Sequence, residues 1–501
     1  METLKRWMKN WKYPTSLLCI YGFFSTVKPL EPFLYPFLTG PDKNLTTEQL
    51  NNQIFPVWTY SYLAVLVPFF LLTDWLRYKP VVVFQSLILF CTTSMLLWCN
   101  GVAEMQAMQF TYGVVTSCDV AYFTYIYSMV ELKHYLKATS YCRTAQLLGY
   151  TVGSVLGQIL VSLELMSYNN ILVFTLVLTG IAMIASILLP MPKVSMFFHK
   201  KKSEEADAEE NSGNVKTLEL GEGFGTTVDL SNDVKVDEAK WQQDVLDGSN
   251  GCNSGSVKSS KSGGKAGCGD VLLRLWRDFL QCFSSRTLLL WSAWWALATC
   301  GYNQTVNYVQ SLWEHVEPSS NFTVYNGGAE ALSNLFGAAA AYGIGLSSAD
   351  WSRWGEMALS ALSALEGGAL FAMVFSGNIW VCYGGYILFK SLYMLLITIA
   401  MFQIAAGLNM ERYALVFGAN TFCALVLQTI ITSVVVDSRG LGVDVVTQFI
   451  IYGAYFSVIA VIFFLRGLYT TMCRKPETET SRENLEEAFK NDAQIVTETK
   501  L

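Results

Sequence analysis

The chain has 501 residues, of which 52% are hydrophobic and only 15% are charged. A soluble globular chain usually carries about 25% charged residues, so this composition indicates a membrane protein. The formal net charge of -6 is modest and acidic, which argues against a nucleic-acid partner.

Apolar runs long enough to span a membrane occur along most of the chain. A spanning helix needs roughly 20 mostly apolar residues, and about twelve such runs are present. They lie near residues 14–38, 55–74, 80–99, 105–130, 140–163, 169–190, 288–312, 325–349, 354–376, 378–406, 412–436 and 446–470. The sequence therefore predicts an all-α membrane protein with one six-helix bundle in residues 14–192 and a second in residues 286–472.

Three further segments are too polar to enter a bilayer. The basic opening stretch, residues 1–13, does not lead into a short apolar core with a small-residue cleavage site, so we interpret it as a cytoplasmic tail. Residues 193–285 are rich in Gly, Ser and charge and poor in aromatic residues, which is typical of a largely disordered linker. Residues 473–501 form a charged tail.

Lysine and arginine are distributed unequally between the loops, and this bias predicts the orientation of the chain. If the N-terminus is cytoplasmic, the inner loops hold most of the basic residues, whereas the outer loops hold only Lys43 and Arg439. This orientation requires an even number of spans and places both termini and the linker in the cytoplasm. Asn44 in "NLT" then lies outside, where it can be glycosylated, as does Asn321 in "NFT".

A short motif recurs at the same place in both groups of spans. "DWLRYKP" follows the second span and "DWSRWGE" follows the eighth. Parallel repeats of this kind are the signature of the major facilitator superfamily fold. We expect Asp74 with Arg77, and Asp350 with Arg353, to pair across helix ends and help close the cytoplasmic side. The alternative is that they are ordinary charged loop ends.

Catalytic and metal-binding patterns are largely absent from the sequence. Most of the 12 cysteines lie inside apolar runs, and the 3 histidines fall at loop or span-end positions. Neither a disulfide framework nor a metal-type CxxC pair is present. We therefore expect a secondary carrier without a cofactor or metal, and not an enzyme.

Several ionisable residues fall inside the expected spans, where each is costly and usually faces a cavity or a partner. They are Lys28, Glu31, Asp119, Glu330 and Lys390. Lys28 and Glu31 lie in "KPLEPFLYPFL", whose prolines loosen the backbone of the first span beside the expected cavity. For Asp119 two interpretations stay open: a direct contact with the substrate, or a buried carboxyl that is protonated or paired across helices.

Aromatic and amide side chains accompany these charges. Phe55 and Trp58 share one face of the second span, Tyr112 lies two helical turns before the acid of the fourth span, and Tyr150 lies mid-span. Rings combined with carboxylates suit a flat cationic heterocycle, although single aromatic residues near span ends more often form the interfacial belt. On the seventh span, Asn303 begins a polar stripe that either lines a cavity or joins helices.

Several long segments resemble the folate–thiamine carrier family of the major facilitator superfamily. They are "KPLEPFLYPFLTGPDKNLT", "IFPVWTYSYL", "LTDWLRYKP", "LPMPKVSMFFH", "WWALATCGYNQTVNYVQ" and "FQIAAGLNMERYALVFGANTF". The resemblance covers nearly all spans of both halves. It implies the twelve-helix major facilitator fold, a plasma-membrane location and uptake of thiamine, and we expect the carrier to act as a monomer.

The resemblance also assigns roles to individual residues. It implies that the thiamine pocket is lined by Glu31, Phe55, Trp58, Tyr112, Tyr150 and Asn303. Asp119 stands where the family has a glutamate, and Lys390 stands at a basic position that folate carriers use for an anion. We expect Glu330 to contribute to the site and to neutralise Lys390, and Lys28 to balance Glu31 when the site is empty.

Charge favours one family substrate over the other. If the five ionisable residues are all charged and face inward, the cavity is acidic by one charge, which suits the permanently positive thiazolium of thiamine better than the two carboxylates of reduced folate. Proton coupling through Glu31 or Asp119 is left open. The alternatives are a reduced-folate or organic-anion exchanger of the same family, and a membrane receptor that binds a ligand without transporting it.

Overall fold

The computed structural model describes residues 11–130, 132–192, 277, 281, 283, 285–319, 324–346, 351–405 and 410–473. All of the described residues belong to one compact unit. The predicted linker at 193–285 and the two predicted tails therefore fall almost entirely outside the described part of the chain.

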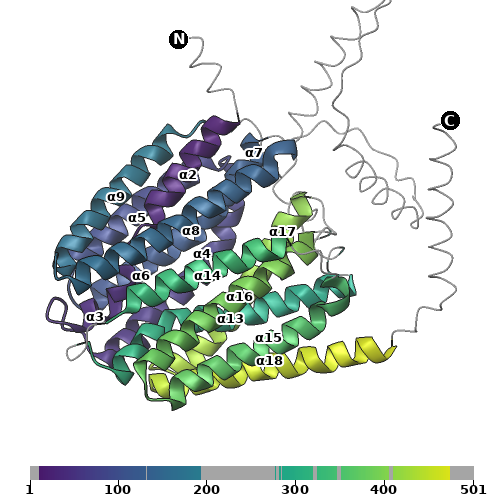
Figure 1. Cartoon of the computed structure of the whole chain (residues 1–501). Helices are drawn as coiled ribbons and strands as arrows, with labels where there is room; N and C mark the ends of the chain where they lie inside the picture. The colour runs from purple at the N-terminus through teal and green to yellow at the C-terminus, as the bar shows by residue number, and fades with distance from the viewer. Residues whose placement is uncertain are drawn as a thin grey trace, which may run out of the picture. The chain divides into compact units, whose positions relative to one another are not determined.

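Every regular element in the described ranges is a helix (Figure 1). The N-terminal half, residues 12–192, contains α2 (Lys12–Thr26), α3 (Leu34–Thr39), α4 (Phe55–Trp75), α5 (Lys79–Trp98), α6 (Val102–Ser117), α7 (Asp119–Met129), α8 (Leu132–Ser162) and α9 (Tyr168–Leu188). The C-terminal half, residues 286–473, contains α13 (Arg286–Val316), α14 (Asn326–Leu346), α15 (Trp351–Phe375), α16 (Ile379–Ala405), α17 (Met410–Ile431) and α18 (Val445–Cys473). Three short turns complete the fold: η1 (Glu31–Phe33), η2 (Gln49–Ile54) and η3 (Thr432–Val436).

The first expected span is not one continuous helix. α2 ends at Thr26, an extended residue follows, and the chain resumes as the short turn η1 and then as α3. Pro29 and Pro32 lack the backbone N–H that an α-helix needs, and the residue before a proline avoids the helical region. The prolines thus break the first span and place Lys28 and Glu31 on non-α backbone.

The fourth expected span shows a milder irregularity at Cys118, between α6 and α7. Cys118 keeps helical dihedral angles, and its N–H lies near the carbonyls of both Val114 and Val115 at 3.2 and 3.1 Å. This is a local tightening of one helical turn. Asp119 follows it immediately, so the irregularity also coincides with an ionisable residue.

Eight of the described helices are long and apolar enough to cross a membrane. The expected spans near 14–38, 105–130, 288–312 and 325–349 are not among these eight. The first two are interrupted, and all four carry charged or amide side chains in place of a uniformly apolar surface. These four segments are also the ones that supply most of the polar lining of the cavity described below.

Helices pack in corresponding pairs in the two halves. In the N-terminal half the main pairs are α4 with α6, α2 with α8, α5 with α9, α5 with α6 and α2 with α9. Their counterparts in the C-terminal half are α14 with α16, α13 with α17, α15 with α18, α15 with α16 and α13 with α18. In this correspondence α4 matches α14 and α8 matches α17. The two main contacts between the halves, α8 with α14 and α4 with α17, are therefore equivalent to each other. The packing therefore repeats, as the recurrent "DW" motif suggests.

The structure places only part of that motif. Asp74, at the end of α4, is 4% exposed, and its carboxylate accepts the hydroxyl of Tyr78 at 2.6 Å. The N–H of Arg77 donates to the backbone carbonyl of Asp74 at 3.2 Å. Asp350 lies outside the described residues, as does the side chain of Arg353. Closure of the cytoplasmic side by these residues stays a prediction.

A row of glycines on α8 accommodates the broken first span. Gly149, Gly153 and Gly157 recur every fourth residue and therefore share one face. A Cβ atom at Gly153 would lie 2.9 Å from the backbone nitrogen of Lys28, and one at Gly157 would overlap the carbonyl of Pro29. Small residues let helix backbones approach closely in membranes. The glycines thus hold the non-α segment against α8.

We expect Gly157→Ala to destabilise the protein by about 1–3 kcal/mol, because the added methyl group has no room beside the Pro29 carbonyl. The melting temperature of the purified protein in detergent measures this effect. Gly368→Ala on α15 is the matched control, since no atom lies within 4 Å of its added Cβ. Equal melting temperatures for the two variants would contradict the packing argument.

Candidate substrate cavity

A cavity of about 520 Å³ is lined by residues from both halves of the protein. Clefts of about 300–1,000 Å³ are typical of small-molecule sites. Ten of the residues singled out from the sequence line it: Lys28, Glu31, Phe55, Trp58, Tyr112, Asp119, Tyr150, Asn303, Glu330 and Lys390. The structure therefore brings together all the expected substrate-binding and charge-balancing residues. Asp74 of the gate motif does not line this cavity.

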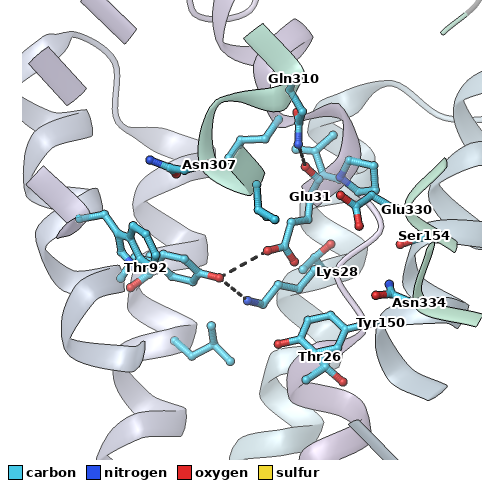
Figure 2. A pocket seen from close by; sticks show the side chains of 18 of the residues that line it. Thr26, Lys28, Glu31, Thr92, Tyr150, Ser154, Asn307, Gln310, Glu330 and Asn334 are labelled. Atoms are coloured by element: carbon cyan, nitrogen blue, oxygen red, sulfur yellow. Dashed lines mark hydrogen bonds between the residues drawn. The ribbon is translucent and has the colours of Figure 1, made fainter. Parts of the chain in front are cut away.

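Lys28, Tyr112 and Glu31 form one cluster in the cavity (Figure 2). The Lys28 ammonium donates to the Tyr112 hydroxyl at 3.0 Å and lies 4.8 Å from the centroid of the same ring. That hydroxyl in turn faces the Glu31 carboxylate at 3.5 Å. The protein's own cation thus occupies a cation–π position beside an exposed carboxylate.

Gln310 of α13 fixes the backbone around Glu31. Its amide N–H donates to the Glu31 carbonyl at 2.9 Å (Figure 2). Its amide oxygen accepts the backbone N–H of Tyr35 at 3.1 Å. These two bonds satisfy polar groups that the broken first span leaves free, as irregular backbone inside a membrane requires. A residue of the C-terminal half therefore positions an acid of the N-terminal half.

Asp119 is held by a neighbouring helix. Gln85 of α5 donates to the Asp119 carboxylate at 2.5 Å and to the Val115 carbonyl at 3.2 Å, while its amide oxygen accepts the Tyr21 hydroxyl at 2.9 Å. The sequence left two interpretations open for Asp119. For one of its carboxylate oxygens, the hydrogen bond from Gln85 matches the interpretation of pairing across helices. Asp119 nevertheless lines the cavity, so a contact with substrate also stays possible in geometric terms.

Glu330 and Lys390 form a close ion pair at 2.5 Å between α14 and α16. The second oxygen of Glu330 accepts the hydroxyl of Tyr386 at 2.6 Å, and the Lys390 ammonium lies 5.6 Å from the centre of that ring. The side chains of Lys390 and Glu330 are only 7% and 15% exposed. Each charge is therefore already satisfied within the protein.

Arg143 of α8 also lines the cavity, and this corrects the expected charge balance. The sequence analysis counted the acids Glu31, Asp119 and Glu330 against two lysines, and overlooked this arginine at the start of the fifth span. With Arg143 the formal charges of the lining residues cancel. The expectation of a net acidic cavity was wrong, and selectivity must come from where each charge sits.

The expected aromatic residues present different amounts of ring surface. Tyr150 is 40% exposed and projects into the cavity (Figure 2), whereas Phe55 is 5% exposed and packs against Tyr308 at 6.0 Å. The Trp58 indole N–H donates to the Thr116 hydroxyl at 3.2 Å, which fixes the orientation of the ring. Tyr150 thus offers the most open stacking surface of these three, and Phe55 the least.

The amide side chains along α13 differ in whether they are hydrogen-bonded within the protein. Asn303 donates to the Gln428 side chain at 3.0 Å, so one of its hydrogen-bonding groups is used between α13 and α17. The side-chain N–H₂ of Asn307 is buried and has no hydrogen-bond partner within the described residues. Asn307 lines the cavity (Figure 2), but its N–H₂ is covered by neighbouring atoms in this conformation.

Membrane helices in two similarly packed halves, enclosing a cavity with balanced charges and rings, define a carrier of small solutes. No group of three or more His, Cys, Asp or Glu side chains suited to a metal ion occurs among the described residues. Residues 9–451 match the family described as the reduced folate carrier. The chain belongs to the reduced folate carrier family.

Individual relatives cover nearly the whole chain. Human thiamine transporter 2 is 48% identical over 94% of this chain and 92% of its own length. Human thiamine transporter 1 is 50% identical over 94% of this chain and 93% of its own length. The human reduced folate transporter is more distant, at 37% identity over 92% of this chain and 73% of its own length.

A solved structure with a similar fold is a mutant of the nucleoside transporter NupG. It matches with a TM-score of 0.56 at 14% identity, over 91% of this chain and 99% of that chain. At this level of identity the likeness concerns the fold alone. It agrees with the all-helical architecture of the described residues.

We expect Lys390→Met to destabilise the protein by about 3–5 kcal/mol, because it leaves the Glu330 carboxylate buried without its cation. The double variant Glu330→Gln with Lys390→Met removes both charges, and it should recover most of the loss. Melting temperatures of the purified variants in detergent test this. Glu104→Gln, at an exposed acid, is the control for removing a charge outside a pair. A single variant as stable as the parent protein would contradict a buried, energetically coupled pair.

Proposed function

We propose that this protein is a plasma-membrane secondary transporter that takes up thiamine by alternating access, and that it is not an enzyme. The observation that carries the proposal is the Lys28 ammonium over the Tyr112 ring beside Glu31, because this cluster is built to hold a cation. The high identity to two thiamine transporters over 94% of the chain supports the same substrate. We further propose a major facilitator fold of twelve membrane helices in two six-helix bundles, with both termini in the cytoplasm.

Thiamine fits this cluster through charge and shape. Its permanently positive thiazolium would take the place of the Lys28 ammonium, facing the Tyr112 ring and the Glu31 carboxylate. The ring of Tyr150 offers a stacking surface to the rest of a flat heterocycle. Release of Lys28 from Tyr112 would then accompany binding.

The same geometry disfavours an anionic substrate. Lys390, the basic position that the family resemblance associates with anions, already pairs with Glu330 at 2.5 Å. An incoming carboxylate would have to displace a buried carboxylate that Tyr386 also holds. The formal charges of the cavity lining sum to zero. Because the carboxylate of Glu31 is exposed while Lys390 is paired with Glu330, a cationic substrate is favoured over an anionic one.

Hydrogen bonds between the halves concentrate at one end of the helices. Asn51 donates to Ser311 at 2.6 Å, Tyr60 donates to Asp437 at 2.7 Å, and Gln158 donates to the carbonyl of Val324 at 2.9 Å. These residues lie toward the ends that we assign to the outside. The conformation therefore has its outer side held shut, and uptake requires these bonds to break in turn with closure of the inner side.

We propose that the loop carrying Asn44 lies on the outer side of the membrane. The Asn44 side chain is exposed, and the residue has a positive φ of 52° in the turn after α3. Nearby, Lys43 is 8% exposed and donates to the carbonyl of Cys99 at 2.6 Å. We propose that Asn44 carries a glycan, because its sequon lies in an ordered loop with the acceptor side chain outward.

We expect Glu31→Gln to abolish saturable uptake of labelled thiamine, because the neutral amide cannot offset the charge of the thiazolium. Uptake into cells that express the variant tests this, with surface labelling to confirm that the protein reaches the plasma membrane. Glu48→Gln, at an exposed acid near η2, is the matched control and should transport normally. Near-normal uptake by Glu31→Gln would remove Glu31 from the binding site.

The transport assignment itself is tested with purified protein in sealed proteoliposomes. Labelled thiamine should accumulate inside, and excess unlabelled thiamine should suppress this, whereas excess reduced folate should leave it unchanged. Suppression by folate, together with uptake of labelled folate, would favour the anion exchanger. Saturable binding without accumulation would favour a receptor that does not transport.

A further inference from the structure

Glu366 is a fully buried carboxyl in the middle of α15, and it does not line the central cavity. It is 0% exposed, and neither carboxyl oxygen makes a hydrogen bond of standard geometry within the described residues; Ser363, one turn earlier on α15, is the polar side chain that interacts with it. The acids that do line the cavity differ in this respect, because Glu31 faces Tyr112 and Asp119 accepts an amide N–H. Glu366 therefore stands apart as an acid without a visible structural role.

The helices around Glu366 provide no pairing cation. On α16, Tyr393 interacts electrostatically with Glu366, while Lys390, about one turn away, is bound to Glu330. Lys390, the cation in this part of α16, is thus already paired with another acid. The face toward α16 is therefore weakly polar and carries no free positive charge.

The faces toward α13 and α18 are similar. On α13, the indole N–H of Trp294 donates to Ser363, one turn before Glu366, at 3.3 Å. On α18, the Tyr455 hydroxyl donates to a backbone carbonyl, and Arg466 pairs with Glu356 at 3.8 Å. Glu356 lies ten residues before Glu366, or about 15 Å along the helix. The titratable side chains in the described middle of α13 are the buried thiol of Cys300 and the hydroxyl of Tyr302, which stacks on Tyr393.

Burial of this kind selects the protonated form of the acid. An ionised carboxylate without a cation or hydrogen-bond donors is very costly in a dry interior, whereas a neutral carboxyl is tolerated. In membrane helices such residues mark ion or proton pathways by default. The geometry of Glu366 therefore describes a carboxyl that holds a proton in this conformation.

A layer of two aromatic rings links Glu366 to the cavity. Tyr393, which interacts electrostatically with Glu366, stacks on Tyr302 with ring centroids 3.9 Å apart and an angle of 11° between the rings. Tyr302 lines the cavity, and the Tyr393 hydroxyl is hydrogen-bonded to Thr299 at 3.0 Å. Tyr302 and Tyr393 are therefore the rings that would have to separate for water from the cavity to reach the carboxyl.

We propose that Glu366 is a proton-binding site that takes up a proton in one conformation and releases it in the other, and so couples proton movement to transport. One proton binds to the carboxylate from water on one side and leaves to water on the opposite side, and no other reactant is needed. The proposal rests on the proposed transport function. It adds a site distinct from Glu31 and Asp119, which are both held by polar partners in the cavity.

The experiment uses the full-length protein in proteoliposomes loaded with labelled or unlabelled thiamine. A pH gradient imposed across the membrane should change the initial uptake rate of the parent protein several-fold. Glu366→Gln, which mimics the protonated acid, should lose this response but keep exchange of internal for external thiamine within about two-fold. Glu48→Gln is the matched control and should respond to the gradient like the parent protein.

The outcomes separate the two proposals. If the parent protein exchanges no thiamine, the transport function fails. If exchange is normal but the gradient has no effect, or if Glu366→Gln responds to it like the parent protein, the proton site is overturned. Infrared spectra give a second readout that does not depend on transport or on the fold of the variant. The parent protein should show the band of a protonated buried carboxyl at neutral pH, and absence of that band would also overturn the proposal.

Discussion

The break in the first membrane helix is the constraint on which the site depends. Pro29 and Pro32 deny the helix two backbone donors, and the freed backbone polar groups must be satisfied inside the protein because the bilayer offers none. The glycines of α8 supply the space, and Gln310 supplies hydrogen bonds at 2.9 and 3.1 Å. On this irregular backbone, Lys28 and Glu31 both reach the hydroxyl of the same tyrosine.

Balanced charge then determines how the cavity selects its substrate. Three acids and three bases line it, and they differ in how far each is already committed to a partner within the protein. The Glu330–Lys390 pair is nearly sealed, whereas Lys28 is held by a single hydroxyl and a ring. The loosely held ammonium of Lys28 lowers the free-energy cost of keeping Glu31 charged when the site is empty. It is also the positive group of the cavity that a cationic substrate displaces most easily.

The sequence predicted the composition of the cavity better than its contacts. Ionisable residues in apolar spans are costly, so their presence alone pointed to the lining, and all five found in this way line the cavity. Arg143 and Glu366 gave the same signal and were overlooked. The roles of Gln85 and Gln310 could not be derived, because the partners of Gln310 lie about 280 residues away in the chain and depend on how the halves meet. Equally, only the packed structure explains why four expected spans are less apolar than the other eight.

Gln310 also links occupancy of the cavity to the seam between the halves. The residue is anchored in α13, yet both of its bonds end on the backbone on either side of η1. Any tilt of one half away from the other must therefore either carry the loop along or sever two hydrogen bonds, each worth about 0.5–1.5 kcal/mol. In either case the carboxylate of Glu31 shifts relative to the rings around it. The backbone groups that Gln310 holds and the carboxylate of Glu31 are thus parts of one short peptide. The affinity of the cavity for a cation therefore has to differ between the closed and the open form of the protein.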